Sequence, residues 1–348
     1  MDRIQGAMAN TEQQALDTQA LTGTRNGPYR SFNPVSRTQI WQWCSAMGDT
    51  NPLYLDTAYQ QSVGITHAVA PPAMMQMWTM RDVNMALAPG SSDTPPYAVF
   101  DALSARGYAA NVAVSYDIQF HRLLQEGDRA HHFTTIASIS ELKRTAIGEG
   151  YFVVEHAEYL DQHDRLYAEA DITYFQYRPV TRTADVDASQ STRDATTSAK
   201  GPAGAHNQHA KLRYADIRVA QALPELRIPI THKLIVSGAI ATQDFIDVHH
   251  NAPAAKAAGM PDIFMNILTT CGLTARYLTD WAGPDARLHR LTFRLQAPNT
   301  PGDSMRLRGQ VTAVEPDARE GQGAVDVAFS GENALGTHVA GSATLSLG

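Results

Sequence analysis

The chain has 348 residues, is 43% hydrophobic and carries a formal net charge of −7, a length that suits two domains of ordinary size. The acidic balance argues against a nucleic-acid partner, because a polyanion is usually met by a basic face. No apolar run approaches the roughly eighteen residues that cross a bilayer, and the N-terminus lacks a signal pattern, so we expect no membrane association. The only two cysteines, Cys44 and Cys271, suggest neither a metal cluster nor a disulfide framework, which favours a reducing cytoplasm.

The first thirty residues differ in composition from the rest of the chain. Residues 1–30 are rich in Gln, Thr, Asn and Gly and lack apolar periodicity, which predicts a mobile N-terminal arm. A first helix is expected from the candidate N-cap Ser36 to Gly48, because Ile40 and Trp43 fall on one face. An Asp-Thr-Asn-Pro turn comes directly after it.

A long apolar segment and a long connection come next. Proline fits the first position of a helix, so the run that starts at residues 71–72 predicts a central helix buried on all sides. Residues 81–110 then form a long connection, and such loops are often binding walls. We hypothesise that the helix is short or broken and that the connection walls a pocket; a tolerated surface insertion is the alternative. The apolar contacts available to such a wall are Met80, Val83, Met85 and Leu87.

Four β-rich stretches and a polar segment complete the first half. Strands rich in Val, Ile, Phe, Tyr and Thr are predicted at 113–120, 132–140, 150–158 and 165–177. After one buried helix, four strands predict an antiparallel sheet wrapped round that helix. Residues 181–212 are crowded with Thr, Ser, Ala, Asp and Gly, which predicts a disordered linker. Its histidines lack a neighbouring cysteine or carboxylate, so we interpret them as solvated residues and predict no metal site.

The stretch from Thr242 to His250 contains the candidate catalytic residues. Asp244 precedes His249 by five residues, a spacing that places the two side chains about 140° apart on a continuous helix. They can meet only if the backbone turns between them. A carboxylate beside an imidazole in such a turn can polarise a water and pass on its proton, which is general acid/base chemistry. The alternative is that Asp244 caps a helix and the histidines lie on the surface.

A second copy of this pattern favours the catalytic interpretation. In the first half Asp49 precedes an aromatic residue, Tyr54, by five positions, and a glycine follows the aspartate by fifteen in both halves. Each glycine leads into an apolar segment. The chain is therefore interpreted as a tandem duplication in which one copy has Tyr54 where the other has His249.

The second half repeats the helix and the four strands. Residues 263–281 are long and apolar enough for a central helix, whose N-terminal N–H groups could hold a developing negative charge. Strands are predicted at 288–295, 304–314, 323–330 and 337–346. Three arginines on or beside the first of these strands could bind phosphate groups, and a solvated strand face is the alternative. They are Arg287, Arg290 and Arg294.

These motifs resemble a known family. The run Gly-Asp-Thr-Asn-Pro-Leu-Tyr at 48–54, and Asp244 with His249, are similar to the Asp-x-Asn-Pro-Leu-His motif of the MaoC-like, R-specific enoyl-CoA hydratases. Asp-Phe-Ile-Asp-Val-His-His at 244–250 and Thr-Asp-Trp-Ala-Gly-Pro at 279–284 resemble the small subunit of the two-subunit hydratase of bacterial steroid side-chain degradation. The first copy resembles the hot-dog domain of its larger subunit, so the two would here be fused in one chain. The second copy departs from the motif at Ile246, where the family has asparagine.

The resemblance implies a fold and a domain division. The fold would be α+β, a tandem or double hot-dog in which each unit has a long central helix wrapped by an antiparallel sheet. Residues 31–180 would be a non-catalytic unit and residues 213–348 the catalytic one. The two would pack as an intrachain pseudo-dimer.

The resemblance also implies an activity. Asp244 and His249 would activate the water that adds to a bulky, steroid-derived 2-enoyl-CoA, and main-chain N–H groups near Met265 and Asn266 would hold the thioester oxygen. No cofactor is implied besides the coenzyme A of the substrate. A homodimer is expected, and a thiolase-like aldolase is a further candidate partner, although the sequence lacks the cysteines of the zinc ribbon that the larger subunit commonly carries. The alternatives are a hydroxyacyl carrier-protein dehydratase and a non-catalytic acyl-thioester-binding protein.

Overall fold

The computed structural model describes residues 18–179, 212–316 and 323–347. The predicted linker at 181–212 lies almost wholly outside this range, as do most of residues 1–30. Part of the expected N-terminal arm is ordered, however, because Arg25–Arg30 form strand β1 and pair antiparallel with β3 (Ala130–Ile139). Backbone pairing with a sheet edge, with Tyr29 fully buried, fixes a segment whose composition alone gave no strand signal.

The first half consists of an antiparallel sheet covered by a layer of short helices. Its helices are α2 (Thr18–Leu21), α3 (Arg37–Met47), α4 (Pro52–Leu55), α5 (Thr57–Ser62), the 3₁₀ turns η1 (Pro72–Met74) and η2 (Met77–Thr79), and α6 (Ala98–Ser104). Its remaining strands are β2 (Ala110–Phe120), β4 (Lys143–Arg144), β5 (Gly148–Asp161) and β6 (Leu166–Pro179). The four predicted strands of this half are confirmed, with longer bounds.

The second half repeats the plan around a full helix. It contains η3 (Tyr214–Asp216), α7 (His232–Ala241), η4 (Asp247–His249), α8 (Ala252–Ala257) and α9 (Ile267–Ala282). Its strands are β7 (Ala222–Ile230), β8 (Arg287–Leu295), β9 (Asp303–Pro316), β10 (Gly323–Asn333) and β11 (Gly336–Leu347). The predicted central helix and all four strands are confirmed.

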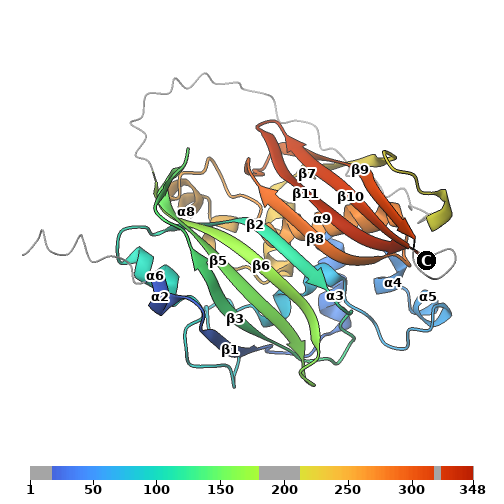
Figure 1. Cartoon of the computed structure of the whole chain (residues 1–348), viewed down its shortest axis with the longest axis horizontal. Helices are drawn as coiled ribbons and strands as arrows, with labels where there is room; N and C mark the ends of the chain where they lie inside the picture. Colours follow the sequence, from blue (N-terminus) through green and yellow to red (C-terminus); the bar gives the residue numbers. More distant parts are fainter. Residues whose placement is uncertain (1–17, 180–211, 317–322, 348) are drawn as a thin grey trace, which may run out of the picture.

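One continuous sheet joins the two halves. Its order is β1-β3-β5-β6-β2-β8-β11-β10-β9-β7, and β2 pairs with β8 at the junction (Figure 1). Tyr116 faces Phe293 and Ile118 faces Leu291 in this pair, so the register is symmetric about Asp117 and Thr292. The expected intrachain pseudo-dimer is therefore confirmed, with a pseudo-twofold axis through the β2–β8 pair.

Matching β-bulges define which residues of the two halves are equivalent. Against β5, the register of β3 shifts just after Ile136, which faces Glu155. Against β10, the register of β9 shifts just after Val311, which faces Val327. Because a bulge pins strand register, Glu155 and Val327 occupy equivalent positions.

The two halves differ most at their central helices. Helix α9 runs for 16 residues along the concave face of its sheet, whereas the expected helix of the first half is broken into η1 and η2, as hypothesised. After Met80 the chain turns away, since the Asp82 carboxylate accepts hydrogen bonds from the backbone N–H groups of Asn84 and Ala86. A side chain that bonds to nearby backbone in this way competes with helix formation.

The exposed part of the connection after Met80 does not form the wall that we hypothesised. Its middle lies along strand β1, where Ser92 N donates to Pro28 O at 2.9 Å and Arg30 Nε donates to Gly90 O at 2.9 Å. Val83 and Met85, two of the expected apolar contacts, are 67% and 48% exposed. The part that returns to the concave face is residues 97–104, which include α6.

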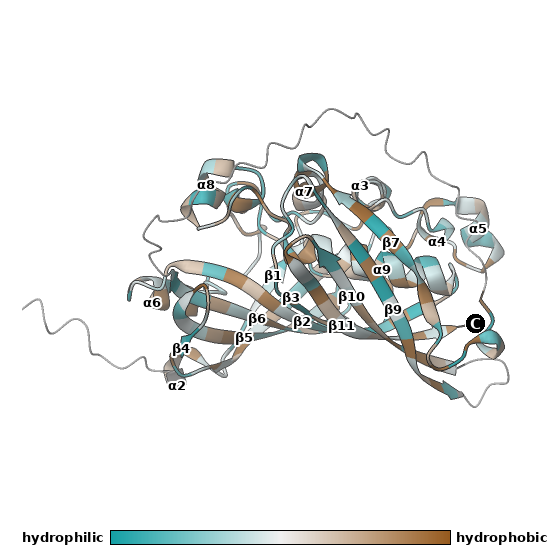
Figure 2. Cartoon of the chain, turned by 90° about the horizontal axis from the view of Figure 1, so that it is seen from above, coloured by the Kyte–Doolittle hydropathy of each residue, from teal (hydrophilic) through white to brown (hydrophobic). Residues whose placement is uncertain are grey.

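The helical layer joins the halves on the concave side (Figure 2). A Cβ on Gly272 of α9 would stand 2.8 Å from the Trp43 ring and 3.0 Å from Met47 Sδ, so α3 lies directly against α9. Arg276 also donates to the carbonyl oxygen of Met47 at 2.8 Å. Cys44 and Cys271 are buried and free, as expected. None of the described helices has the length and apolar character that a membrane crossing requires.

Candidate active site

A break in the helical backbone brings Asp244 to His249. Helix α7 ends at Ala241, Gln243 adopts the left-handed conformation at φ 55°, and the short η4 turn closes at His249. The N–H of Asp244 still donates to Ala239 O at 2.9 Å, which anchors the aspartate to the end of α7. The turn that the spacing of five required is therefore present.

The two side chains face each other in a buried position. His249 Nε2 lies 3.5 Å from Asp244 Oδ2, and the residues are only 6% and 7% exposed. Nδ1 of His249 lies 2.7 Å from the carbonyl oxygen of Phe264. Since a carbonyl only accepts, Nδ1 carries the proton in the neutral ring, and Nε2 is left with a lone pair directed at the aspartate.

Asn266 holds the aspartate in place. Its Nδ2 donates to Asp244 Oδ2 at 2.9 Å and to Thr242 Oγ1 at 2.8 Å, while its Oδ1 caps α9 by accepting from Thr269 N at 2.7 Å. The other carboxylate oxygen, Asp244 Oδ1, is buried and has no hydrogen-bond partner among the described residues. A buried carboxylate oxygen without a partner is costly, so this atom marks a place for a polar ligand or a water.

The N-terminus of α9 lies next to this pair, and it changes the expected thioester contacts. The N–H of Met265 donates to Asn299 O at 3.0 Å, so that group is not available to a substrate oxygen. The first helical residues, Ile267 and Leu268, have N–H groups without a partner in the described part of the chain, as the first turn of a helix normally does. The sequence located the helix start correctly but missed the capping side chain of Asn266 and the carbonyl of Phe264.

The equivalent position in the first half lacks a base. Tyr54 is buried, and the pKa of its phenol is well above the ordinary value. Burial is the largest cause, and the negative charge of Asp49 is the second. Asp49 Oδ1 accepts from the N–H of Asn51 at 2.9 Å. A phenol that stays protonated cannot replace an imidazole as a general base, so the two halves are chemically unequal.

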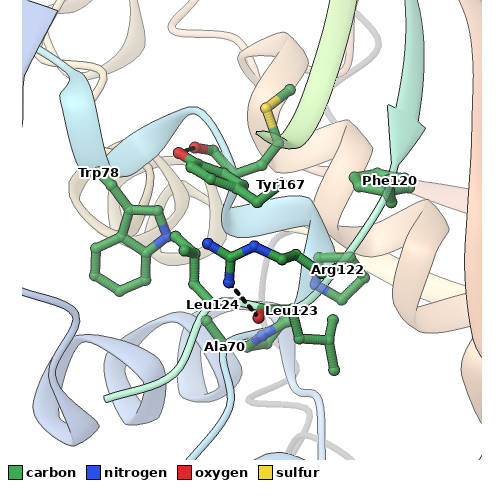
Figure 3. Close-up of a pocket in the computed structure, with 10 residues that line it drawn as sticks. Ala70, Trp78, Phe120, Arg122, Leu123, Leu124 and Tyr167 are labelled. Carbon is green, nitrogen blue, oxygen red and sulfur yellow. Dashed lines mark hydrogen bonds between the residues drawn. The ribbon is translucent and has the colours of Figure 1, made fainter. Parts of the chain in front are cut away.

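Large side chains surround the start of η1 on the side of Trp78. Figure 3 shows Trp78, Tyr167 and Arg122 around this point, where the cavity measures only about 10 Å³, close to the minimum for one water. The larger cavity of about 240 Å³ beside Tyr54 borders the same helix start, since Pro72 and Arg122 line both spaces.

The three predicted phosphate-binding arginines do not form one cluster. Arg287 lines a cavity of about 240 Å³ that lies between the two halves, beside Tyr54. Arg290 makes a two-point ion pair with Asp117 at 2.6 and 2.9 Å, which commits it to the β2–β8 junction. Arg294 is exposed at the other end of β8, the end that continues to Asn299 beside Met265.

No metal centre is indicated by the described residues, among which no group of three or more His, Cys, Asp or Glu side chains could hold an ion. The histidines of the predicted linker lie outside that range.

Sequence comparisons place the chain in a family. Residues 20–170 match the family model described as "FAS1-like, dehydratase domain region". The chain is 44% identical over 129 residues to the 3-oxo-4,17-pregnadiene-20-carboxyl-CoA hydratase beta subunit of Mycobacterium tuberculosis, covering 95% of that protein and 37% of this chain. It is 36% identical over 162 residues to a probable enoyl-CoA hydratase alpha subunit of Thermomonospora curvata, covering 46% of this chain and 51% of the relative. The chain thus spans only about half of that second relative.

Solved structures agree on the fold. A MaoC-like dehydratase superposes with a TM-score of 0.66 at 20% identity, covering 94% of this chain and 98% of that one. A double hot-dog protein of Mycobacterium tuberculosis, titled as a conserved hypothetical protein, gives 0.61 at 13% identity, over 94% and 96%. The fold is a double hot-dog, and the chain belongs to the MaoC-like enoyl-CoA hydratase family. Within that family its relatives include both the beta and the alpha subunit of the pregnadiene-carboxyl-CoA hydratase.

Proposed function

We propose that this chain hydrates a bulky 2-enoyl-CoA, with Asp244 and His249 as its catalytic pair. The observation that supports the proposal most directly is the unpartnered Asp244 Oδ1 beside the free lone pair of His249 Nε2. A water between these atoms could donate one hydrogen bond to each. Its oxygen would then be directed toward a substrate at the α9 N-terminus.

The chemistry is an addition of water without a change of redox state. His249 Nε2 takes a proton as the water oxygen bonds to the β-carbon, and the electron pair of the double bond moves toward the thioester oxygen. The protonated imidazole then returns a proton to the α-carbon, which gives the 3-hydroxyacyl-CoA. Asp244 orients the water and stabilises the imidazolium that forms.

The start of α9 is suited to the charge that develops on the thioester oxygen. Free N–H groups and the positive end of the helix dipole favour an anion there. We assign this contact to the N–H groups of Ile267 and Leu268 instead of that of Met265. Asn266 acts by positioning, because its side chain is already bonded to Asp244 and Thr242.

The bulk of the acyl group is inferred from the broken helix of the first half and from the relatives' names. Protein interiors are packed about as densely as organic crystals, so a continuous helix leaves little free space over its sheet. The first half has no helix as long as α9. A steroid-derived acyl group, as in the substrate named for the relatives, would use that space. Coenzyme A enters as part of the substrate; homodimerisation, an aldolase partner and a cytoplasmic location stay predictions.

Turnover of polycyclic and short enoyl-CoA substrates tests the proposal. The purified full chain should consume the conjugated thioester, seen as loss of its absorbance, and prefer the polycyclic substrate to crotonyl-CoA. Absence of turnover on every enoyl-CoA would leave a thioester-binding protein as the function. A preference for crotonyl-CoA would contradict the substrate class alone.

A further inference from the structure

In the first half of the chain, a cluster of polar side chains lies on the concave face of the sheet. The equivalent positions in the second half are apolar. The register of the strands pairs each member with an equivalent residue of the second half. Tyr29, His132, Thr134, Glu155, Tyr159 and Tyr174 are equivalent to Leu226, Leu307, Gly309, Val327, Gly331 and Leu345, respectively. The polar groups are thus a feature of the non-catalytic half alone.

The position of the cluster follows from a difference between the central helices of the two halves. The first half has no counterpart of the C-terminal turns of α9. In the second half the C-terminal part of α9 covers these positions, since Tyr277 Oη lies 3.3 Å from where a Cβ on Gly309 would stand. Counted from the two aspartates, Tyr277 corresponds to Asp82, which lies beyond the break at Met80. The strand positions beneath the lost turns therefore carry Thr134 and Glu155 in place of glycine and valine.

Glu155 is the central member of the cluster. It is 2% exposed, and Thr134 Oγ1 donates to its Oε1 at 2.5 Å, while Oε2 is buried without a hydrogen bond that meets normal geometry. Burial raises the pKa of this carboxyl to about 7, against the opposing effect of the Thr134 and Tyr174 hydroxyls. The group can therefore be present as a neutral acid that donates a hydrogen bond.

The returning connection adds two more polar groups. The guanidinium of Arg81 lies 5.5 Å from the centre of the Tyr97 ring, and Arg81 Nε is buried without a partner in the described structure. Tyr97 is the N-cap residue of α6, and its ring stacks on that of Phe100 with the ring centroids 5.5 Å apart. The first half thus contains a buried donor, Arg81 Nε, and a buried acceptor, Glu155 Oε2, that both lack a hydrogen-bond partner in the described structure.

The cluster is electrostatically close to the catalytic pair. The charge of Glu155 is the largest cause of the raised pKa of the Tyr97 phenol, and the charge of Asp244 contributes to the same shift. Figures 1 and 2 show α8, which directly follows the His249 turn, at the same end of the molecule as α6. The charges of both carboxyl groups thus act on the Tyr97 phenol, and that of Glu155 has the larger effect.

We propose that Glu155, together with Tyr97 and Arg81, binds an uncharged oxygen, a ketone or a hydroxyl, at the end of the acyl group remote from the thioester. A polycyclic acyl group bound at Asp244 and His249 would extend over the strands that the lost helix turns uncover. An apolar end would leave Glu155 Oε2 and Arg81 Nε unpaired, at the cost of a buried unsatisfied group. This inference rests on the proposed function and specifies its substrate class.

The test compares two polycyclic enoyl-CoA substrates that differ only in the distal ketone. Wild type should favour the ketone by about tenfold in kcat/KM, the range expected for a buried hydrogen bond. Glu155→Val, which installs the residue of the equivalent position, should remove that preference, with the change appearing mainly in KM. Glu155→Gln keeps a donor and should retain part of it, and Tyr97→Phe should reduce it without altering a strand.

The matched control is Glu158→Gln on the same strand, where the side chain points to solvent and pairs with Arg25. It should keep the full preference. A wild type that does not distinguish the two substrates, or a Glu155→Val variant that loses activity on both equally, would overturn the proposal. If no enoyl-CoA is turned over, calorimetric binding of the two saturated acyl-CoA analogues still tests the ketone preference separately from the catalytic proposal.

Discussion

Among single residues, Asn266 links the N-terminal cap of α9 to the aspartate that we propose as catalytic. The oxygen of its side-chain amide caps α9, and the amide nitrogen donates hydrogen bonds to Asp244 and Thr242. This arrangement leaves one carboxylate oxygen and one imidazole nitrogen free for a water. In the function that we propose, the same helix start would supply the N–H groups for the thioester, so a single element would position both the catalytic pair and the oxyanion contact.

Removal of either member of the catalytic pair should abolish most of the activity. We expect Asp244→Asn and His249→Ala each to lower kcat by about 10² to 10⁴, the usual contribution of general acid/base catalysis. Circular dichroism should show a folded protein in both cases. Tyr54→Phe, at the equivalent position of the other half, is the control and should alter kcat little. Loss of activity in His250→Ala with normal rates in His249→Ala would move the site by one residue.

The buried Glu155 should make stability depend on pH. Its pKa is raised from 4.5 to about 7 in the folded chain, so the folded state binds the proton more tightly than the unfolded state. The contribution of this bound proton to the free energy of unfolding is complete below the pKa of the unfolded chain. It is lost as the pH rises toward the pKa of the folded chain, and the total loss is about 3 kcal/mol. Glu155→Gln should lack this loss, so the difference in Tm between the variant and wild type should grow from pH 5 to pH 8. A constant difference would contradict the shift.

At the scale of elements, the contact between α3 and α9 holds the two halves together on the concave side. Gly272 permits it, because Trp43 and Met47 occupy the space where a side chain would begin. A single glycine thus lets a helix of one half pack against the central helix of the other. Helix α9, whose N-terminus borders the candidate site, is thereby supported by the first half of the chain.

A branched residue at Gly272 should separate these helices. We expect Gly272→Val to reduce the free energy of unfolding by about 1–3 kcal/mol through overpacking, measured by denaturant titration. A second substitution, Trp43→Leu, should recover part of the loss if the clash is the cause. Equal stability of Gly272→Val and wild type would show that α3 can move away without cost.

In the whole molecule, the two halves share one plan and differ in the residues that we propose for catalysis and for acyl binding. The second half keeps the base, the cap and a full helix. The first half has lost the base and the C-terminal turns of its helix, and it carries a polar cluster in their place. The continuous sheet through β2 and β8 keeps both halves in one fixed geometry.

The second half should not function alone. Expression of residues 213–348 would expose the edge of β8 and the face of α9 that packs on Trp43 and Met47, and an exposed edge strand promotes aggregation. We expect an insoluble or inactive product, judged by size-exclusion chromatography and hydration assays. Co-expression with residues 1–180 is the control and should restore activity. A soluble, active fragment would contradict the interdependence of the halves.

The amino-acid sequence alone predicted the tandem plan, the central helix of the second half, eight of the strands and the meeting of Asp244 with His249. Local patterns are sufficient there, because strand alternation, helix caps and a five-residue spacing are written in neighbouring residues. Strand β1 and the outward course of residues 84–95 were decided by pairing with distant segments. The assignment of Met265 failed for the same reason, since its N–H is bonded to Asn299, 34 residues away along the chain. The polar cluster around Glu155 likewise appears only when strand register aligns the two halves, because its members come from five separate segments that the fold brings together.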